Sequence, residues 1–120
     1  MSLEDAVVLI ITEARSNEQG LLASIRSGAD PGAERMRRLI SALKIIFHAL
    51  TGQAELDRSL AAALFTLGSD VPLTISSLAS KGQSWRREFM EVEVYELLMG
   101  VQSIFEDKWL GEAEPPETIH

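Results

Sequence analysis

The chain has 120 residues, no cysteine and a net charge of −7. A chain of this length is typical of a single domain and buries enough surface to fold without disulfides or metal ions. The lack of cysteine excludes disulfides, thiolate metal sites and a cysteine nucleophile, and it fits the reducing cytoplasm.

The negative charge is concentrated near the end of the chain. Residues 88–120 hold nine acidic side chains and one basic side chain, whereas residues 1–87 hold nine acidic and ten basic ones. Because an acidic surface repels nucleic-acid phosphates and anionic lipids, we expect neither nucleic acid nor a membrane as a partner. The first five residues lack the basic charge of a signal peptide, and the apolar runs at 6–11 and 60–65 are too short to span a bilayer. We therefore expect a soluble, cytoplasmic protein.

The first thirty residues predict one helix. Ser2 is a suitable N-cap, and apolar residues between positions 7 and 25 repeat at helical spacing. The polar run at 16–20 weakens the middle of this pattern. We expect one long helix that ends at Gly28.

The pair Asp30-Pro31 predicts the start of a second helix, because aspartate caps helices and proline fits the first helical turn. Gly52 is the expected end. The apolar residues of this segment fall on one side of a helical wheel. They are Met36, Leu39, Ile40, Leu43, Ile46, Phe47 and Leu50.

The second half of the chain predicts three more helices, over residues 53–67, 72–80 and 84–109. Gly68 closes the first of these, Pro72 opens the second, and Ser84 caps the last. No stretch alternates apolar and polar residues as a strand would. The sequence thus predicts an all-α fold, an antiparallel helical bundle of four to five helices, with a single helical domain at 1–111 and a disordered acidic C-terminal tail at 112–120.

The last helix carries two apolar sets that point more than about 90° apart on one helical wheel. Either this helix is central and packed on both sides, or one set meets another chain. Aromatic residues and methionine are enriched at protein interfaces, so the second set is our candidate partner-binding surface. The expected core set is Val94, Leu97, Leu98, Val101, Ile104 and Phe105. The candidate partner-binding set is Trp85, Phe89, Val92, Tyr95 and Met99.

His48 is the alternative functional residue. It should face solvent, about 140° from the apolar centre of its helix, with Lys44 nearby and Gly52 one turn later. A phosphoacceptor histidine needs this exposure, a cation and an open approach. The run His48-Ala49-Leu50-Thr51-Gly52 resembles the histidine-phosphotransfer pattern His-x-Leu-Lys-Gly, although Thr51 stands where that pattern has lysine. The resemblance implies a helical signalling domain with His48 as phosphoacceptor.

Other chemical motifs are missing from the sequence. The glutamates at 88, 91, 93 and 96 have no histidine at the spacing of a bundle metal site, so they read as a solvated acidic face. There is no Gly-x-Ser-x-Gly nucleophile and no glycine-rich phosphate loop. We expect no metal, no cofactor and no enzyme activity. The most favoured function is a small acidic protein-binding module, acting as an adaptor, an inhibitor or immunity protein, or a chaperone, with a protein partner or itself in a homodimer.

Overall fold

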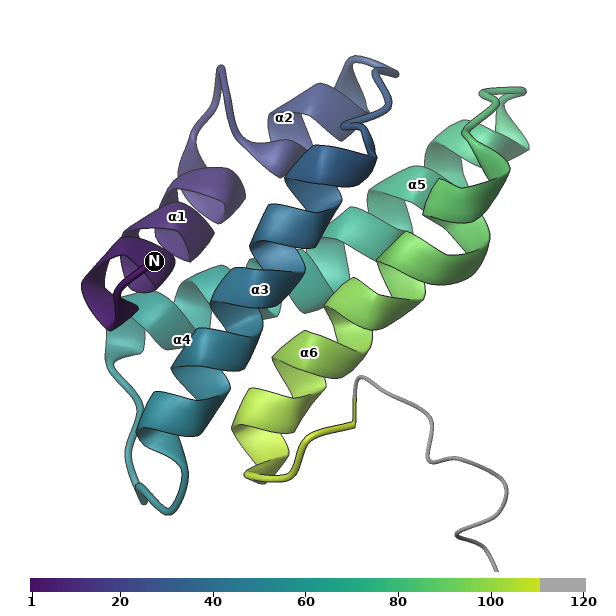
Figure 1. The fold of residues 1–120 in the computed structure, drawn as a ribbon. Helices are drawn as coiled ribbons and strands as arrows, with labels where there is room; N and C mark the ends of the chain where they lie inside the picture. Colours follow the sequence, from purple (N-terminus) through teal and green to yellow (C-terminus); the bar gives the residue numbers. More distant parts are fainter. Residues whose placement is uncertain (111–120) are drawn as a thin grey trace, which may run out of the picture.

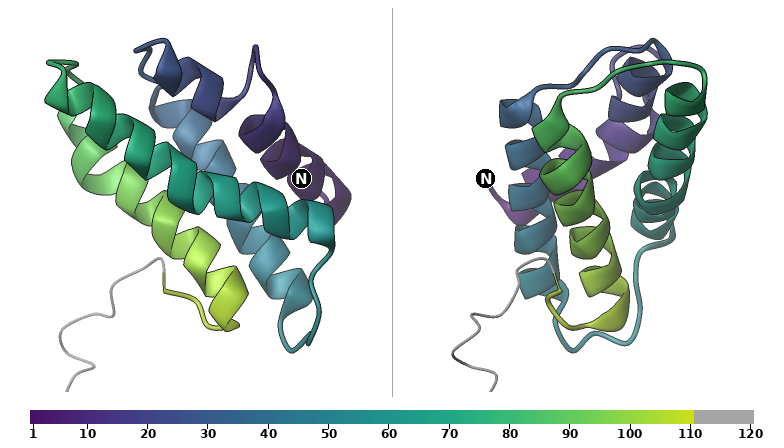
Figure 2. Two further views of the ribbon diagram at one scale, coloured as in Figure 1. Left: turned by 180° about the vertical axis from the view of Figure 1, so that it is seen from behind. Right: turned by 90° about the vertical axis from the view of Figure 1, so that its right-hand side faces the viewer.

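The computed structural model describes residues 1–110, which form helices and connecting loops with no strand in that range. Helices α3 and α6 lie side by side, and the remaining helices form a second layer behind them (Figures 1 and 2). The prediction of an all-α bundle is confirmed. The elements are α1 (Leu3–Arg15), α2 (Leu21–Arg26), α3 (Ala33–Leu50), α4 (Arg58–Phe65), η1 (Thr66–Asp70), α5 (Val71–Ser80), η2 (Phe89–Glu93) and α6 (Val94–Glu106), where η denotes a π-helical segment.

The first predicted helix is in fact two helices. Ser2 and Asp5 form a reciprocal capping box that starts α1, as the N-cap prediction requires. The chain leaves the helix at Ser16 and re-enters it after Gly20. A Cβ on Gly20 would lie 2.7 Å from the carbonyl oxygens of Glu13 and Ser16, so the backbone there packs too closely for a side chain. The expectation of one long helix was wrong because this close turn breaks it.

Helix α3 has the buried face that the sequence predicts. Six of its seven predicted apolar residues are buried, and Leu50 packs at the margin of the core. The start of the helix differs from the prediction. Gly32, not Asp30, precedes the first helical residue, and Pro31 lies outside the first turn. The Asp30 carboxylate instead accepts hydrogen bonds from Gly32 and Arg86.

The third and fourth predicted helices form one continuous helix, Arg58–Ser80 (Figure 2). Gly68 does not end it. The π segment η1 carries the chain past Gly68, where a Cβ would lie 3.1 Å from Val101 Cγ1 on α6. Glycine is therefore needed there for close packing between helices, and not for a cap. The helix starts later than the predicted residue 53, because Asp57 is its N-cap. The Asp57 side chain accepts a hydrogen bond from the Leu60 N–H.

The π segment η2 changes the phase of the last helix. The helical stretch starts at Arg87 and passes through η2 before α6. A π turn adds one residue, which rotates all later residues by about 100° relative to a regular α-helix. With this rotation Phe89 comes into line with Leu97, and both are fully buried. The two apolar sets seemed to point apart because the wheel assumed an unbroken α-helix.

The chain turns back after α6 at Asp107, which has φ 56° in the left-handed region. Trp109 then packs edge-on against Phe47, with ring centroids 5.5 Å apart, and the Leu110 N–H donates to Ser103 Oγ. The helix therefore ends at Glu106, three residues before the predicted position. The predicted tail at 112–120 lies outside the described residues.

Candidate functional site

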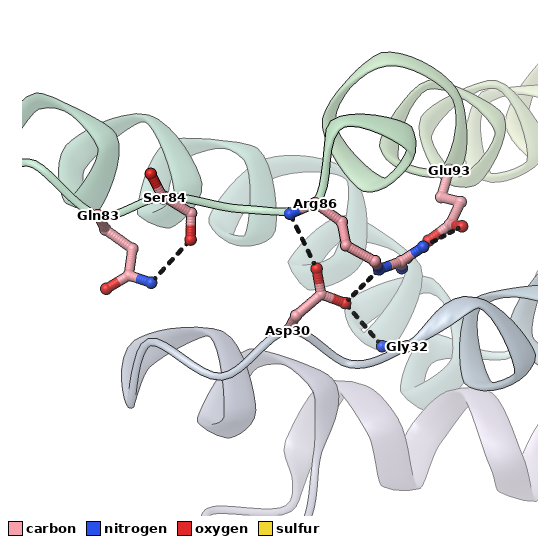
Figure 3. Close-up of polar contacts among 6 residues, drawn as sticks. All are labelled: Asp30, Gly32, Gln83, Ser84, Arg86 and Glu93. Carbon is pink, nitrogen blue, oxygen red and sulfur yellow. Dashed lines mark hydrogen bonds and ion pairs between the residues drawn. The ribbon is translucent and has the colours of Figure 1, made fainter.

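A charged cluster centred on Arg86 joins the loop before α3 to the start of the last helix (Figure 3). The guanidinium donates two hydrogen bonds to Glu93, at 2.6 and 3.1 Å, and one to Asp30 at 3.0 Å. The bonds to Glu93 raise the pKa of Arg86, against the effect of burial, and the bonds to Asp30 add to this. Partial burial raises the pKa of Asp30, but hydrogen bonds from Gly32 and Arg86 outweigh it and hold that pKa below its usual value. The charges in this cluster satisfy one another, as structural ion pairs do.

A second arginine cluster joins α1, α2 and α3. Arg35 donates two hydrogen bonds to the buried carboxylate of Glu13, at 2.5 and 2.8 Å. It also donates to Ser24 Oγ and to the Gln19 carbonyl oxygen. The hydrogen bonds to Glu13 raise the pKa of Arg35. This cluster closes the break between α1 and α2, which gives it a structural role.

His48 is exposed on α3, as predicted. Its ring lies against Phe47 at 5.3 Å between centroids. Two groups expected to assist it have contacts of their own. The Asp107 carboxylate accepts from the Gly52 N–H, with 3.1 Å from the nitrogen to each oxygen, so the expected open glycine is tied to the residue that follows α6. The Lys44 ammonium lies over the Trp109 ring, 5.6 Å from its centroid, so this cation already contacts an aromatic ring.

A polar cleft lies between α3 and the last helix. Arg37, Ser41 and Lys44 line one wall, and Glu88 and Glu96 line the other. The expectation of a solvated acidic face was wrong for Glu93, which is buried and paired with Arg86. Glu88 and Glu96 face a basic strip of α3. Among the described residues, no three histidine or carboxylate side chains are placed to hold one metal ion.

The five residues of the candidate partner-binding set lie in different environments. Phe89 is fully buried in the core, and Trp85 is half-buried, with its ring 5.6 Å from that of Phe89. Val92 and Tyr95 are exposed, and Met99 is half-buried. The rotation at η2 explains this division, since it turns Phe89 inward and leaves the residues that follow on the outer side. The indole N–H of Trp85 is buried without a hydrogen-bond acceptor among residues 1–110.

An apolar groove runs between α4–η1 and α6. Leu64, Gly68 and Val101 form its floor, and Phe65 and Phe105 line its edges. Met99, from the predicted set, also lines it. Phe105 was expected in the core, yet its side chain is 48% exposed, and Phe65 is 66% exposed. The sequence did not indicate this groove, because its walls come from helices whose relative placement no local pattern specifies.

The continuous helix Arg58–Ser80 is long and apolar enough to cross a membrane by length and composition alone. Its most apolar window has a mean hydropathy of 1.3, and 33% of that window is buried in the fold. The sequence argument from short apolar runs did not foresee this, since it treated the segment as two helices. Core helices of globular proteins pass the same test, and the buried residues here belong to the hydrophobic core.

Comparison with protein-family models, with curated proteins and with solved structures found no match for this chain.

Proposed function

We propose that this chain is a non-catalytic protein-binding module, of the adaptor, inhibitor or immunity, or chaperone type. It binds through the outer face of its last helix and the adjoining groove. The observation that carries the proposal is the exposure of large apolar side chains on two neighbouring helices, with an apolar groove between them. Contiguous apolar surface of this kind marks association sites in soluble proteins.

The charged groups support a binding role over a catalytic one. Glu13 and Glu93, the two buried carboxylates of residues 1–110, are each paired with an arginine that also holds neighbouring elements together. A catalytic acid or base instead needs a reachable group poised to exchange a proton. His48 meets the need for exposure, but the Asp107 carboxylate binds the N–H of Gly52, the glycine expected to leave the approach to the histidine open. The residues that line the apolar groove are all uncharged and are not part of these ion pairs.

Part of the surface expected from the sequence remains in this proposal. Tyr95 and Met99 stay as contact residues, because Tyr95 is exposed on α6 and Met99 lines the groove. Phe65 and Phe105 join them. Val92 is also exposed, but it lines the polar cleft beside α3. Phe89 and Trp85 are not contact residues. They pack on the core and hold the start of this helix against it. The partner is another protein or a second copy of this chain.

A photo-crosslinking amino acid at position 95 tests the proposal in cells that produce the protein. We expect an adduct of one defined mass at position 95, which Phe105→Glu in the same chain abolishes. The matched control carries the crosslinker at Val8, which is 58% exposed on α1, a helix that supplies none of the residues lining the groove. An adduct of twice the mass of the chain identifies self-association. Equal labelling from positions 95 and 8, or none from position 95, contradicts the proposal.

A further inference from the structure

The two helices that flank the groove carry no positive charge over most of their length. Residues 59–80 and 89–106 contain no lysine, arginine or histidine. The nearest cations along the chain, Arg58, Lys81, Arg87 and Lys108, lie beyond the ends of these segments. The charged side chains within them are all carboxylates: Asp70, Glu91, Glu93, Glu96 and Glu106.

The same two helices also carry large exposed apolar side chains. The long helix Arg58–Ser80 runs antiparallel to α6 (Figures 1 and 2), and the two meet at η1, where Gly68 faces Val101. On one helix Phe65 and Leu73 are each 66% exposed. On the other, Tyr95 is 56% exposed. Phe105 continues this second row beside the groove. The groove between the two helices is lined by uncharged residues, and Asp70 and Glu106 follow two of them in the chain.

We propose that the occupant of this surface is an amphipathic helix with lysine or arginine beside its apolar residues. This inference rests on the proposed binding function and specifies its partner. A groove between two helices accepts the apolar ridge of a third, whose side chains recur every three or four residues. Cations flanking that ridge would meet the carboxylates of Asp70 and Glu106, which follow Ser69 and Phe105, two residues that line the groove. The other acids of these segments already face cations of this chain, because Glu91 and Glu93 pair with arginines and Glu96 faces the basic strip of α3.

The charge distribution favours this occupant over two others. A second copy of the chain would bring its own acids against these acids, and each copy carries a net charge of −7. A lipid surface is usually bound by helices with lysine and arginine on the polar side, which these segments lack. A cationic helix gains from both the apolar and the charged part of the surface.

Synthetic peptides provide the test. Three fluorescent peptides share one pattern of leucines at helical spacing and differ at the polar positions, which are lysine, glutamine or glutamate. We expect the lysine peptide to bind tightest, the glutamate peptide weakest, and the lysine peptide to weaken at high ionic strength. A scrambled lysine peptide of the same composition, which cannot form an apolar ridge, should bind about tenfold or more weakly.

Substitutions locate the peptide on the protein. Phe105→Ser and Phe65→Ser should each weaken the lysine peptide by about tenfold, since they remove apolar contacts at the two edges of the groove. Val8→Ser, an equally exposed apolar position on α1, should leave binding unchanged. Circular dichroism confirms that each variant is folded before binding is compared.

Each other outcome overturns a defined part of this inference. Equal binding of the glutamine and lysine peptides would contradict the claim that the partner is cationic, but it would leave the proposed binding function intact. Equal loss in Val8→Ser and Phe105→Ser shows that the peptide binds elsewhere. A dimer of the free protein that Phe105→Ser dissociates assigns the surface to a second copy, and binding to phosphatidylcholine vesicles assigns it to lipid. If no peptide binds while the photo-crosslinking residue at position 95 still captures a protein, the partner class is wrong and the binding function stands.

Discussion

Arg86 and Glu93 form an ion pair of two hydrogen bonds, at 2.6 and 3.1 Å, between the loop before the last helix and its π turn. The glutamate side chain is 9% exposed, and the same guanidinium holds Asp30 of the loop before α3. The pair therefore links three segments at the point where the last helix begins (Figure 3). It also fixes the start of the helix whose outer face carries the proposed binding surface.

Replacing Glu93 with alanine should lower the melting temperature by several degrees, because it leaves Arg86 with half of its partners and opens the junction. Glu91→Ala is the matched control. Glu91 pairs with Arg87, but both side chains are mostly exposed, so this pair contributes little. Thermal unfolding followed by circular dichroism measures both variants. A similar small change in the two would show that the Arg86 cluster does not support the fold.

The stability contributed by Asp30 should depend on pH. Its folded pKa is lowered, so its contribution is present above the pKa of the unfolded chain, about 3.9 for aspartate, and is lost as the pH falls through the folded pKa. Asp30→Asn should therefore melt below the wild type at neutral pH, and the difference should shrink at more acidic pH. Melting temperatures of both proteins across this range provide the measurement. A difference that stays constant with pH would contradict the role of the charge.

The helical pattern in the sequence predicted the core of this fold well where helices are regular. The buried face of α3 follows the α-helical period through eighteen residues, so each predicted position lies where the wheel places it. The pattern fails at the π segments. Nothing in the residues around Gly68 or Phe89 marks an added residue in the turn, and each π turn shifts the phase of all that follows.

The candidate binding surface was predictable only in part. Tyr95 and Met99 were identified from the aromatic and apolar character of the last helix, and Tyr95 is exposed while Met99 lines the groove. Phe65 was missed because its segment read as an ordinary amphipathic helix. Whether such a residue is buried depends on which helix packs against it. Here α6 covers the Gly68 side of Arg58–Ser80 and leaves Phe65 at the edge of the groove.

Gly20→Ala should destabilise the protein, although alanine favours helices. Its Cβ would lie 2.7 Å from two backbone carbonyl oxygens, of Glu13 and Ser16, and neither can move without distorting the end of α1. Gly32→Ala is a useful comparison, since its Cβ would meet nothing within 4 Å and its cost is limited to the strain of φ +89°. Denaturant unfolding measures both. A smaller loss of stability for Gly20→Ala than for Gly32→Ala would contradict the close packing described at this turn.

His48→Ala should change the unfolding free energy by less than about 0.5 kcal/mol, because an exposed side chain outside the core contributes little. Incubation with a small phosphodonor, followed by mass spectrometry under conditions that preserve phosphohistidine, should give no phosphorylated protein. An acid-labile phosphoryl group that disappears in His48→Ala would instead support the phosphotransfer alternative. Asp107→Asn is the informative second variant, since it removes the negative charge bound at Gly52.

Phe89→Glu and Tyr95→Glu should have opposite effects, although the sequence placed both residues in one set. Phe89 is fully buried, and a glutamate there would bring an unpaired charge into the core, so this variant should be unfolded. Tyr95 is mostly exposed, so Tyr95→Glu should keep the melting temperature of the wild type while it loses the partner. Circular dichroism separates folding from binding, and a binding assay is interpreted only for the folded variant. A folded Phe89→Glu protein would show that the π turn does not direct Phe89 inward, and the phase of the whole last helix would then have to be assigned anew.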